Sequence, residues 1–269
     1  MTKRQVFRIL RFLILIYAVI GIVIFYAQDY IILHPKALPK DHQFTFSEPF
    51  KELTIPYNAN TSINLIQFKT SDSISKGVVL YFHGNRENIN RYAGFAPYVT
   101  RHGYEIWMID YPGFGKSTGN FTEEAVYEWA LTFYKLARAR FSPDSIIIYG
   151  RSLGTGAATQ LASIRDCRSL ILETPFYSMP SVFDSYLPVY PFNKMIYLKF
   201  PNYEHLQKVD APVTIFHGGD DGVIPIRNAK KLIPVLKPYS EFVSIRDGHH
   251  NDLSNFPEFT TKIDSILSQ

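Results

Sequence analysis

The sequence predicts an α/β fold with a mostly parallel sheet and helices on both of its faces, preceded by one N-terminal transmembrane helix. Three observations support this prediction. The chain has 269 residues, of which 46% are hydrophobic and 19% charged, which is typical of one large globular domain with an appendage. A long uncharged apolar segment stands near the N-terminus, and after it short apolar runs alternate with segments of helical character. This alternation is typical of parallel strands covered by helices.

The apolar segment favours a membrane anchor over residues 1–28. Residues 12–27 carry no charge, and together with residues 9–11 they form a helix of about 28 Å, close to the roughly 30 Å of a bilayer's hydrocarbon core. A cleaved signal peptide is the alternative interpretation. A cut after Ala27 would, however, place the bulky Phe25 where such sites require a small residue.

The formal net charge of +4 is concentrated at the N-terminus. Four cations precede the first acidic residue, Asp29: Lys3, Arg4, Arg8 and Arg11. Because all of them precede the apolar segment, the positive-inside rule predicts a single-pass protein with a cytoplasmic N-terminus and an extracytoplasmic domain. The rest of the chain is neutral and lacks the basic face that a phosphate backbone requires, so nucleic acid is not an expected partner.

The remainder divides into a tether and a domain. Residues 29–60 are rich in Pro, Phe and Tyr, and we expect them to pack onto the domain of residues 61–269. Continuous β-branched runs in that domain are typical of parallel strands buried on both faces. The predicted strands are INLIQF from Ile63, GVVLYF from Gly77, YEIWMID from Tyr104, SIIIYG from Ser145, SLILE from Ser169, VTIFHG from Val213 and FVSIRD from Phe242.

Helices are expected between these strands. The segments with helical character are residues 87–101, 122–140, 155–164, 226–236 and 256–267. In a sheet of this kind, ligands bind beyond the carboxyl ends of the strands. Functional residues are therefore expected where each strand ends.

One strand runs directly into a G-x-S-x-G motif. The motif consists of Gly150, Ser152 and Gly154, followed by the small-residue segment TGAATQLA. Glycines are needed on both sides because the turn is so sharp that a side chain there would meet neighbouring backbone. The turn would hold the Ser152 hydroxyl at the amino end of a helix, whose dipole favours negative charge. The alternative is a plain glycine-rich turn, but the strand–turn–helix context favours a nucleophile.

A serine nucleophile needs a later histidine base and a carboxylate that orients it. Candidates of both kinds follow in the order Ser, Asp, His. Asp220 and Asp221 follow the strand VTIFHG, and His249 and His250 follow the last predicted strand. The alternatives are a loop turn for the aspartates and a surface loop for the histidines.

With these residues, the body from about Ile63 to the C-terminus resembles the α/β-hydrolase superfamily. It is most similar to the small-lid, membrane-anchored serine hydrolase group with acyl-protein thioesterase-like and serine aminopeptidase-like members. The resemblance implies an α/β-hydrolase fold. In that group the acid is the D of an H-G-x-x-D-x-x-[IV]-P run, which residues 217–225 match with Asp221.

The resemblance also selects among the histidines. The family's base precedes an N-D pair, so His250 matches better than His249. Some members take the acid from the end of the preceding strand, which keeps Glu173 as a reserve candidate. The resulting catalytic set is Ser152, Asp221 and His250.

Two N–H donors are needed for the oxyanion of the tetrahedral intermediate. One is the amide of Leu153, the residue after the nucleophile. The other is suggested by the segment YFHGN, which looks like the family's oxyanion loop and implies the amide of Asn85. We interpret His83 as a structural hydrogen-bonding residue, and Asp110 as structural because it precedes the nucleophile.

Rival sites find little support. Residues 113–117, GFGKS, suggest a phosphate-binding loop, but Asp110 occupies the position of its first glycine and Pro112 removes a backbone donor. The chain has no H-E-x-x-H motif and no cysteine pair, so no metal site is predicted. No cofactor is required by the expected mechanism.

The segment 176–203 is expected to form a short lid. It is dense in Phe, Tyr and Pro, and it forms either an apolar wall for an acyl chain or a cover over the sheet. Arg151 either meets a substrate carboxylate or is solvated.

The sequence thus predicts a membrane-anchored serine hydrolase that cleaves an ester, thioester or amide of a small-molecule or acylated substrate through an acyl-enzyme. Esterase or thioesterase activity is favoured over peptidase activity. The alternative is a catalytically inactive, membrane-tethered binding or scaffold protein of the same fold.

Overall fold

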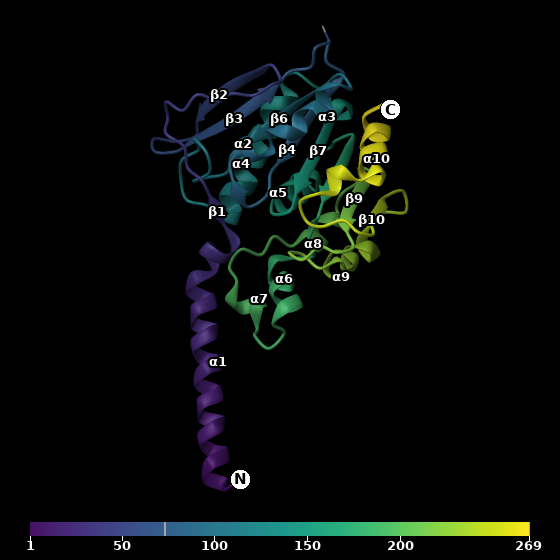
Figure 1. Ribbon diagram of the computed structural model, residues 1–269. Coiled ribbons are helices and arrows are strands. Elements are labelled where there is room, and N and C mark those ends of the chain that lie inside the picture. The colour runs from purple at the N-terminus through teal and green to yellow at the C-terminus, as the bar shows by residue number, and fades with distance from the viewer. Residues whose placement is uncertain (73, 269) are drawn as a thin grey trace.

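The computed structural model describes residues 1–72 and 74–268. An eight-stranded sheet forms the centre of the body, in the order β10-β9-β8-β7-β4-β6-β3-β2, and a long helix, α1, projects from one end of it (Figure 1). The strands are β2 (Phe50–Pro56), β3 (Ser62–Phe68), β4 (Gly77–Phe82), β6 (Tyr104–Ile109), β7 (Ile146–Arg151), β8 (Ser169–Glu173), β9 (Val213–Gly218) and β10 (Glu241–Ile245). A separate short pair joins β1 (His34–Pro35) to β5 (Arg86–Glu87).

Helices and strands alternate from β5 to β8, whereas β1 to β5 follow one another without a helix and three helices separate β8 from β9. The helices are α1 (Lys3–Ile32), α2 (Ile89–Tyr92), α3 (Ala96–Thr100), α4 (Glu123–Arg138), α5 (Gly154–Ala162), α6 (Met179–Tyr186), α7 (Phe192–Met195), α8 (Asn202–Leu206), α9 (Ile226–Ala229) and α10 (Pro257–Ser268). Short 3₁₀ turns η1 (Ala93–Phe95), η2 (Pro143–Ser145), η3 (Lys230–Val235) and η4 (Leu253–Asn255) complete the chain.

The sheet is parallel from β6 through β4 to β10, but β3 runs antiparallel to both of its neighbours. The run INLIQF was expected among the parallel strands, and its direction is corrected here. A strand that is buried on both faces is a continuous apolar segment whether its neighbours are parallel or antiparallel to it. Its composition therefore does not show the direction of the strand. Residues 50–56, within the expected tether, form the edge strand β2, whose partly exposed residues lack the signature of a buried strand.

Two hydrophobic layers cover the sheet, one on each face. Along β4, Leu80 points into one layer and Tyr81 into the other. The first layer includes Trp129 of α4, and the second includes Phe259 of α10. Burial on both faces explains why the central strands are unbroken apolar runs.

Helix α1 has 30 residues, starts at a capping box on Thr2 and reaches about 45 Å. It is long and apolar enough to cross a membrane, and its most apolar window has no residue buried inside the molecule. A signal sequence near the N-terminus would meet the same criteria. The C-terminal half of α1 lies beside α6 and α7 (Figure 1).

Candidate active site

Ser152 lies at a sharp turn between β7 and α5. Its φ of 50° is in the left-handed region, which costs a non-glycine residue energy and is typical of strained functional positions. A Cβ on Gly150 would lie 2.7 Å from Cβ of Ala158, and one on Gly154 would lie 2.1 Å from the carbonyl oxygen of Phe82. Only glycine fits at either position, so the turn geometry accounts for the spacing of the motif.

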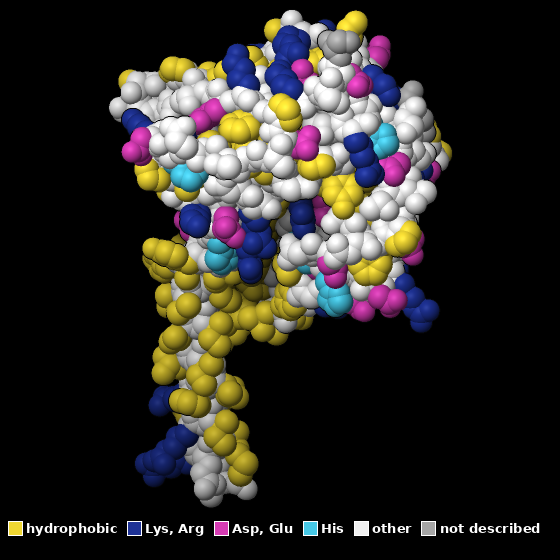
Figure 2. Space-filling model, turned by 45° about the horizontal axis from the view of Figure 1, so that its top comes forward, with side chains coloured by type: hydrophobic (Ala, Val, Ile, Leu, Met, Phe, Trp, Pro, Cys, Tyr) yellow, Lys and Arg dark blue, Asp and Glu magenta, His cyan; other side chains and the backbone are white. Residues whose placement is uncertain are grey.

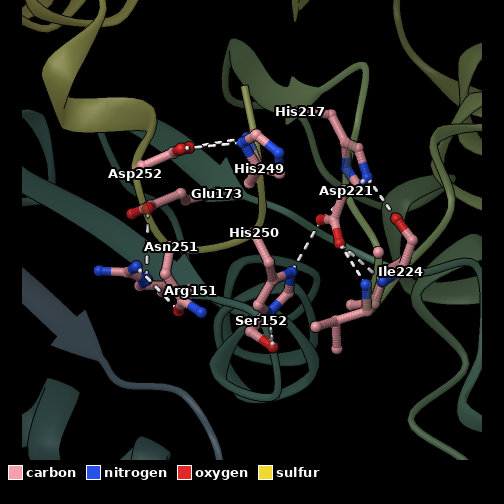
Figure 3. Close-up of polar contacts among 12 residues, drawn as sticks. Arg151, Ser152, Glu173, His217, Asp221, Ile224, His249, His250, Asn251 and Asp252 are labelled. Atoms are coloured by element: carbon pink, nitrogen blue, oxygen red, sulfur yellow. Dashed lines mark hydrogen bonds and ion pairs between the residues drawn. The ribbon is translucent and has the colours of Figure 1, made fainter. Parts of the chain in front are cut away.

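The structure brings Ser152, His250 and Asp221 together (Figure 3). Nε2 of His250 lies 2.9 Å from Oγ of Ser152, and its Nδ1 lies 2.7 Å from Oδ2 of Asp221. The three residues follow β7, β10 and β9, so they meet at the carboxyl edge of the sheet. This arrangement can carry a proton from the hydroxyl to the imidazole while the carboxylate orients the ring.

Asp221 is held in the ionised state by its surroundings. Burial by itself would raise the pKa of this carboxyl, but the hydrogen bond and charge of His250 and the N–H of Ile224 hold the pKa below its usual range. Its Oδ1 accepts from the N–H groups of Val223 and Ile224, both at 2.8 Å. An ionised acceptor at Nδ1 requires the proton there and leaves Nε2 free to act as a base.

His217 contacts Asp221. The sequence identified this histidine only as the first residue of the H-G-x-x-D-x-x-[IV]-P run. It is fully buried, and burial lowers the pKa of its imidazole. Its Nε2 lies 2.8 Å from the carbonyl oxygen of Ile224 and 3.4 Å from Oδ2 of Asp221. The neutral ring therefore fixes the loop that presents the carboxylate.

The residues of the two expected oxyanion donors, Leu153 and Asn85, line the same cavity as Ser152. Within the described residues, the N–H groups of Leu153 and Asn85 donate to no protein acceptor. A Cβ on Gly84 would lie 3.6 Å from Cβ of Ser152, so the loop of Asn85 closely approaches the serine. The Asn85 side chain points elsewhere and donates to the carbonyl oxygen of Ile32 at 2.6 Å. The arrangement supports the backbone of Asn85, and not its side chain, as a donor.

His249 and Asp220, the chain neighbours of His250 and Asp221, lie away from Ser152. His249 is exposed, and its Nδ1 pairs with Asp252 at 3.0 Å, away from the serine (Figure 3). Asp220 is exposed. Neither of these residues takes part in the hydrogen-bonded chain of Ser152.

Glu173 and Arg151 form a neighbouring ion pair. Nε of Arg151 lies 3.2 Å from Glu173, and Glu173 also accepts from the hydroxyl of Tyr149 at 2.7 Å. The reserve acid is therefore committed to other partners than His250. Arg151 was expected to meet substrate or water, and the structure corrects this: its side chain is 18% exposed and neutralises a buried carboxylate.

The other polar candidates are structural. Nε2 of the fully buried His83 lies 3.2 Å from Asp110, and its Nδ1 lies 2.7 Å from the carbonyl oxygen of Gly84. Lys116, the lysine of the GFGKS segment, pairs with Glu52 at 2.8 Å. The described residues contain no cluster of three or more His, Cys, Asp or Glu side chains able to hold a metal ion.

A cavity of about 410 Å³ adjoins Ser152. Met179 and Phe183 of α6 and Phe192 of α7 line it, together with Ile24 and Ile31 of α1. Other lid aromatics cover the body, as in the stacked pair of Tyr177 and Tyr203. Some side chains of the lid thus line the cavity, and others pack against the hydrophobic core.

Comparison with known proteins agrees with this architecture. A family model described as serine aminopeptidase, S33, matches residues 73–203. Alpha/beta hydrolase domain-containing protein 17C of Xenopus tropicalis is 28% identical over 200 residues, covering 72% of this chain and 62% of that protein, less than two thirds of its length. Protein 17B of Homo sapiens is 28% identical over 202 residues, covering 72% and 67%.

Solved structures share the fold at low sequence identity. An esterase from Pyrococcus furiosus has a TM-score of 0.67 at 17% identity, covering 88% of this chain and 96% of that chain. Acetyl xylan esterase 1 from Thermoanaerobacterium has a TM-score of 0.65 at 16% identity, covering 86% and 87%.

The fold is thus that of the α/β hydrolases, as the sequence predicted. The matching family model and the relatives place the chain in the α/β-hydrolase superfamily and support a hydrolase.

Proposed function

We propose that this protein is a membrane-anchored serine hydrolase that cleaves an ester or thioester through an acyl-enzyme. The observation that carries the proposal is the hydrogen-bonded chain from Ser152 through His250 to Asp221. A nucleophile, a base and an orienting carboxylate in contact are what acyl transfer from a serine requires.

The reaction proceeds in two halves. As Oγ of Ser152 attacks the substrate carbonyl, Nε2 of His250 accepts the hydroxyl proton, and Asp221 stabilises the imidazolium. The N–H groups of Leu153 and Asn85 bind the oxyanion. His250 then gives its proton to the departing alcohol or thiol, which leaves Ser152 acylated. Water, deprotonated by His250, attacks the acyl-enzyme. His250 then returns that proton to Oγ of Ser152 as the carboxylic acid is released.

The surroundings of Ser152 favour esters and thioesters over peptides. The cavity that adjoins the serine is lined mainly by apolar side chains of the lid and of α1. Such a cavity suits an acyl chain, whereas a peptide backbone would bring polar groups that need hydrogen-bond partners. The names of two structural neighbours, both esterases, point in the same direction.

The anchor in this proposal is α1. Its uncharged stretch is preceded by four cations and followed by Asp29, so the positive-inside rule directs the N-terminus to the cytoplasm and the domain of residues 61–269 to the opposite side.

Labelling by a fluorophosphonate probe tests the nucleophile. The full-length wild type in detergent should be labelled, and Ser152→Ala should lose labelling and turnover of p-nitrophenyl esters. Ser163→Ala, a serine just past the other end of α5, is the matched control and should keep both. Labelling that persists in Ser152→Ala, or a folded wild type that stays unlabelled, would contradict the proposal.

A further inference from the structure

We propose, on the basis of the function proposed above, that α1 is one wall of the acyl site and opens that site to the bilayer. The substrate is then a long-chain acyl ester or thioester whose chain lies in the membrane, and Ile24 and Ile31 of α1 set the preferred chain length. Four structural features lead to this inference.

The first feature is the contact between the middle of α1 and the lid. The ring of Tyr17 stacks on that of Tyr190, with centroids 4.4 Å apart and planes 4° apart. The Tyr17 hydroxyl donates to the carbonyl oxygen of Val189 at 3.0 Å, and the Tyr190 hydroxyl donates to that of Tyr17 at 2.7 Å. A Cβ carbon on Gly21 would already lie 3.0 Å from the Tyr190 ring, so the glycine permits this close approach.

The second feature is Gln28, a polar residue in an otherwise apolar stretch, which is 1% exposed. Its Nε2 donates to the carbonyl oxygen of Met195 at 3.3 Å, and its Oε1 accepts from the N–H of Tyr197 at 3.0 Å. A buried amide is costly unless it is hydrogen-bonded. Both ends of this amide are satisfied by backbone groups, the carbonyl of the last residue of α7 and an N–H just after that helix, so Gln28 joins α1 to the lid.

The third feature links the end of α1 to the oxyanion loop. The Asn85 side chain donates to the carbonyl oxygen of Ile32, the last residue of α1, at 2.6 Å. The N–H of His34 donates to the carbonyl oxygen of Asn85 at 2.9 Å. Helix α1 is therefore fixed relative to Ser152, and Ile24, Ile31 and Ile32 line the cavity beside it. A spanning helix held in this way shapes the acyl site as well as anchoring the chain.

The fourth feature is the exposed apolar tip of the lid, which we define as residues 186–189. Tyr186, Leu187 and Val189 are 55%, 37% and 59% exposed. Hydrophobic side chains continue from α1 onto this side of the body (Figure 2). Tyr17, which contacts the lid next to this tip, lies about 16 Å along the helix axis from Gln28.

The depth of that contact places the tip in the bilayer. The uncharged stretch of α1 runs from residue 12 to residue 28, so Tyr17 lies well inside the hydrocarbon when the helix spans. The lid tip beside it must then share that depth. Its apolar side chains suit lipid, and an acyl chain can pass from the leaflet into the cavity between the lid and α1.

A larger side chain on α1 that fills part of the cavity tests whether this helix forms a wall of the acyl site. In proteoliposomes, Ile24→Trp should lower the ratio of kcat/KM for palmitoyl over acetyl p-nitrophenyl esters by at least about tenfold, because one methylene in an apolar site already matters by about that factor. The control is Val23→Trp, next in the chain but 54% exposed, which should leave the ratio within about twofold. Ile24→Ala enlarges the cavity and should move the preference towards longer chains.

The two proposals can fail separately. If the wild type is not labelled at Ser152, the proposed function fails. If it is labelled and active, but both tryptophan variants change the ratio equally or neither does, the inference about α1 is overturned. Labelling of Ile24→Trp by a small fluorophosphonate shows that the variant is folded.

Quenching by brominated lipids tests the depth of the tip. Val189→Trp should be quenched by bromines on the acyl chains beyond the level of the wild type, whose two tryptophans are buried in the body. The control is Ile74→Trp, which is 84% exposed in the loop before β4, at the opposite edge of the sheet from the site, and should show no added quenching. No added quenching at Val189 would overturn entry from the bilayer.

Discussion

Two buried histidine–aspartate pairs lie at the carboxyl edge of the same sheet, and they differ in what the imidazole faces. His83 and Asp110 follow β4 and β6, whereas His250 and Asp221 follow β10 and β9. In the first pair, the second ring nitrogen meets the backbone carbonyl oxygen of Gly84. In the second pair, it meets the hydroxyl of Ser152 beside an open cavity.

The carboxyls of the two pairs also have opposite pKa shifts. Burial raises the pKa of Asp110, which receives only one backbone N–H, from Ile89, besides His83. Burial acts on Asp221 in the same direction, but His250 and the backbone donors outweigh it and lower the pKa. Asp221 receives more donors than Asp110 and is less deeply buried, and both differences favour the opposite directions of the two shifts.

The comparison teaches that a histidine–aspartate contact is not by itself a catalytic arrangement. Both pairs are buried and both have short contacts. Only one has a nucleophile on its free nitrogen. The other ties the strand ends together below the loop that carries Asn85.

The largest expected effect comes from removing the base. In the mechanism proposed above, His250→Ala should lower kcat by about 10⁶-fold, because loss of the base of a serine triad is nearly equivalent to loss of the whole triad. His249→Ala, the neighbouring exposed histidine, should stay within about twofold. Ester hydrolysis by the two purified variants measures this. Equal losses would break the distinction between the two histidines.

The next largest effect is expected from the two carboxylates, whose replacement should lower kcat to different extents. Asp221→Asn should lower kcat by about 10⁴-fold, because the amide stabilises the wrong imidazole tautomer. Asp110→Asn should cost less than about tenfold, since it acts through the loop alone. Steady-state kinetics at neutral pH compares the two. A loss at Asp110 as large as that at Asp221 would make both pairs catalytic.

A smaller effect is expected at the loop that the first pair supports. Asn85→Ala keeps the backbone N–H and removes only the side-chain bond to Ile32. We expect kcat for an acetyl ester to fall by less than about tenfold, whereas loss of an oxyanion donor costs about 10²–10³-fold. A fall in the latter range would assign the side chain to the oxyanion.

The smallest effect is on stability against pH. The folded pKa of Asp110 is raised, so its stabilising contribution is fully present below the unfolded value of about 3.9 and is lost as pH rises through the folded pKa. The folded pKa of Asp221 is lowered, so its contribution is present above about 3.9 and is lost as pH falls through the folded pKa. The two carboxyls therefore act in opposite directions.

Unfolding of the two asparagine variants in detergent measures this difference. Relative to wild type, Asp110→Asn should gain stability as pH rises above about 4, and Asp221→Asn should gain stability as pH falls below about 4. Parallel curves for the two variants would contradict the opposite pKa shifts.

Much of the fold was predictable because its signals are local. Unbroken apolar runs predicted the central strands, and the prediction of an α/β-hydrolase fold is confirmed. The edge strand β2 was missed because only one side of it is covered. The antiparallel direction of β3 was missed because an apolar segment has the same composition in a parallel and in an antiparallel pair.

The sequence by itself determined the order of strands and helices, the strained turn at Ser152 and the chemical types available for a site. These follow from hydrophobic period and from glycines that a sharp turn requires. The family motif in the sequence already selected His250 over His249, whereas the tertiary structure alone decided that Arg151 pairs with Glu173 and that α1 lies against the lid. Each of these depends on contacts between residues far apart in the chain, which no local pattern encodes.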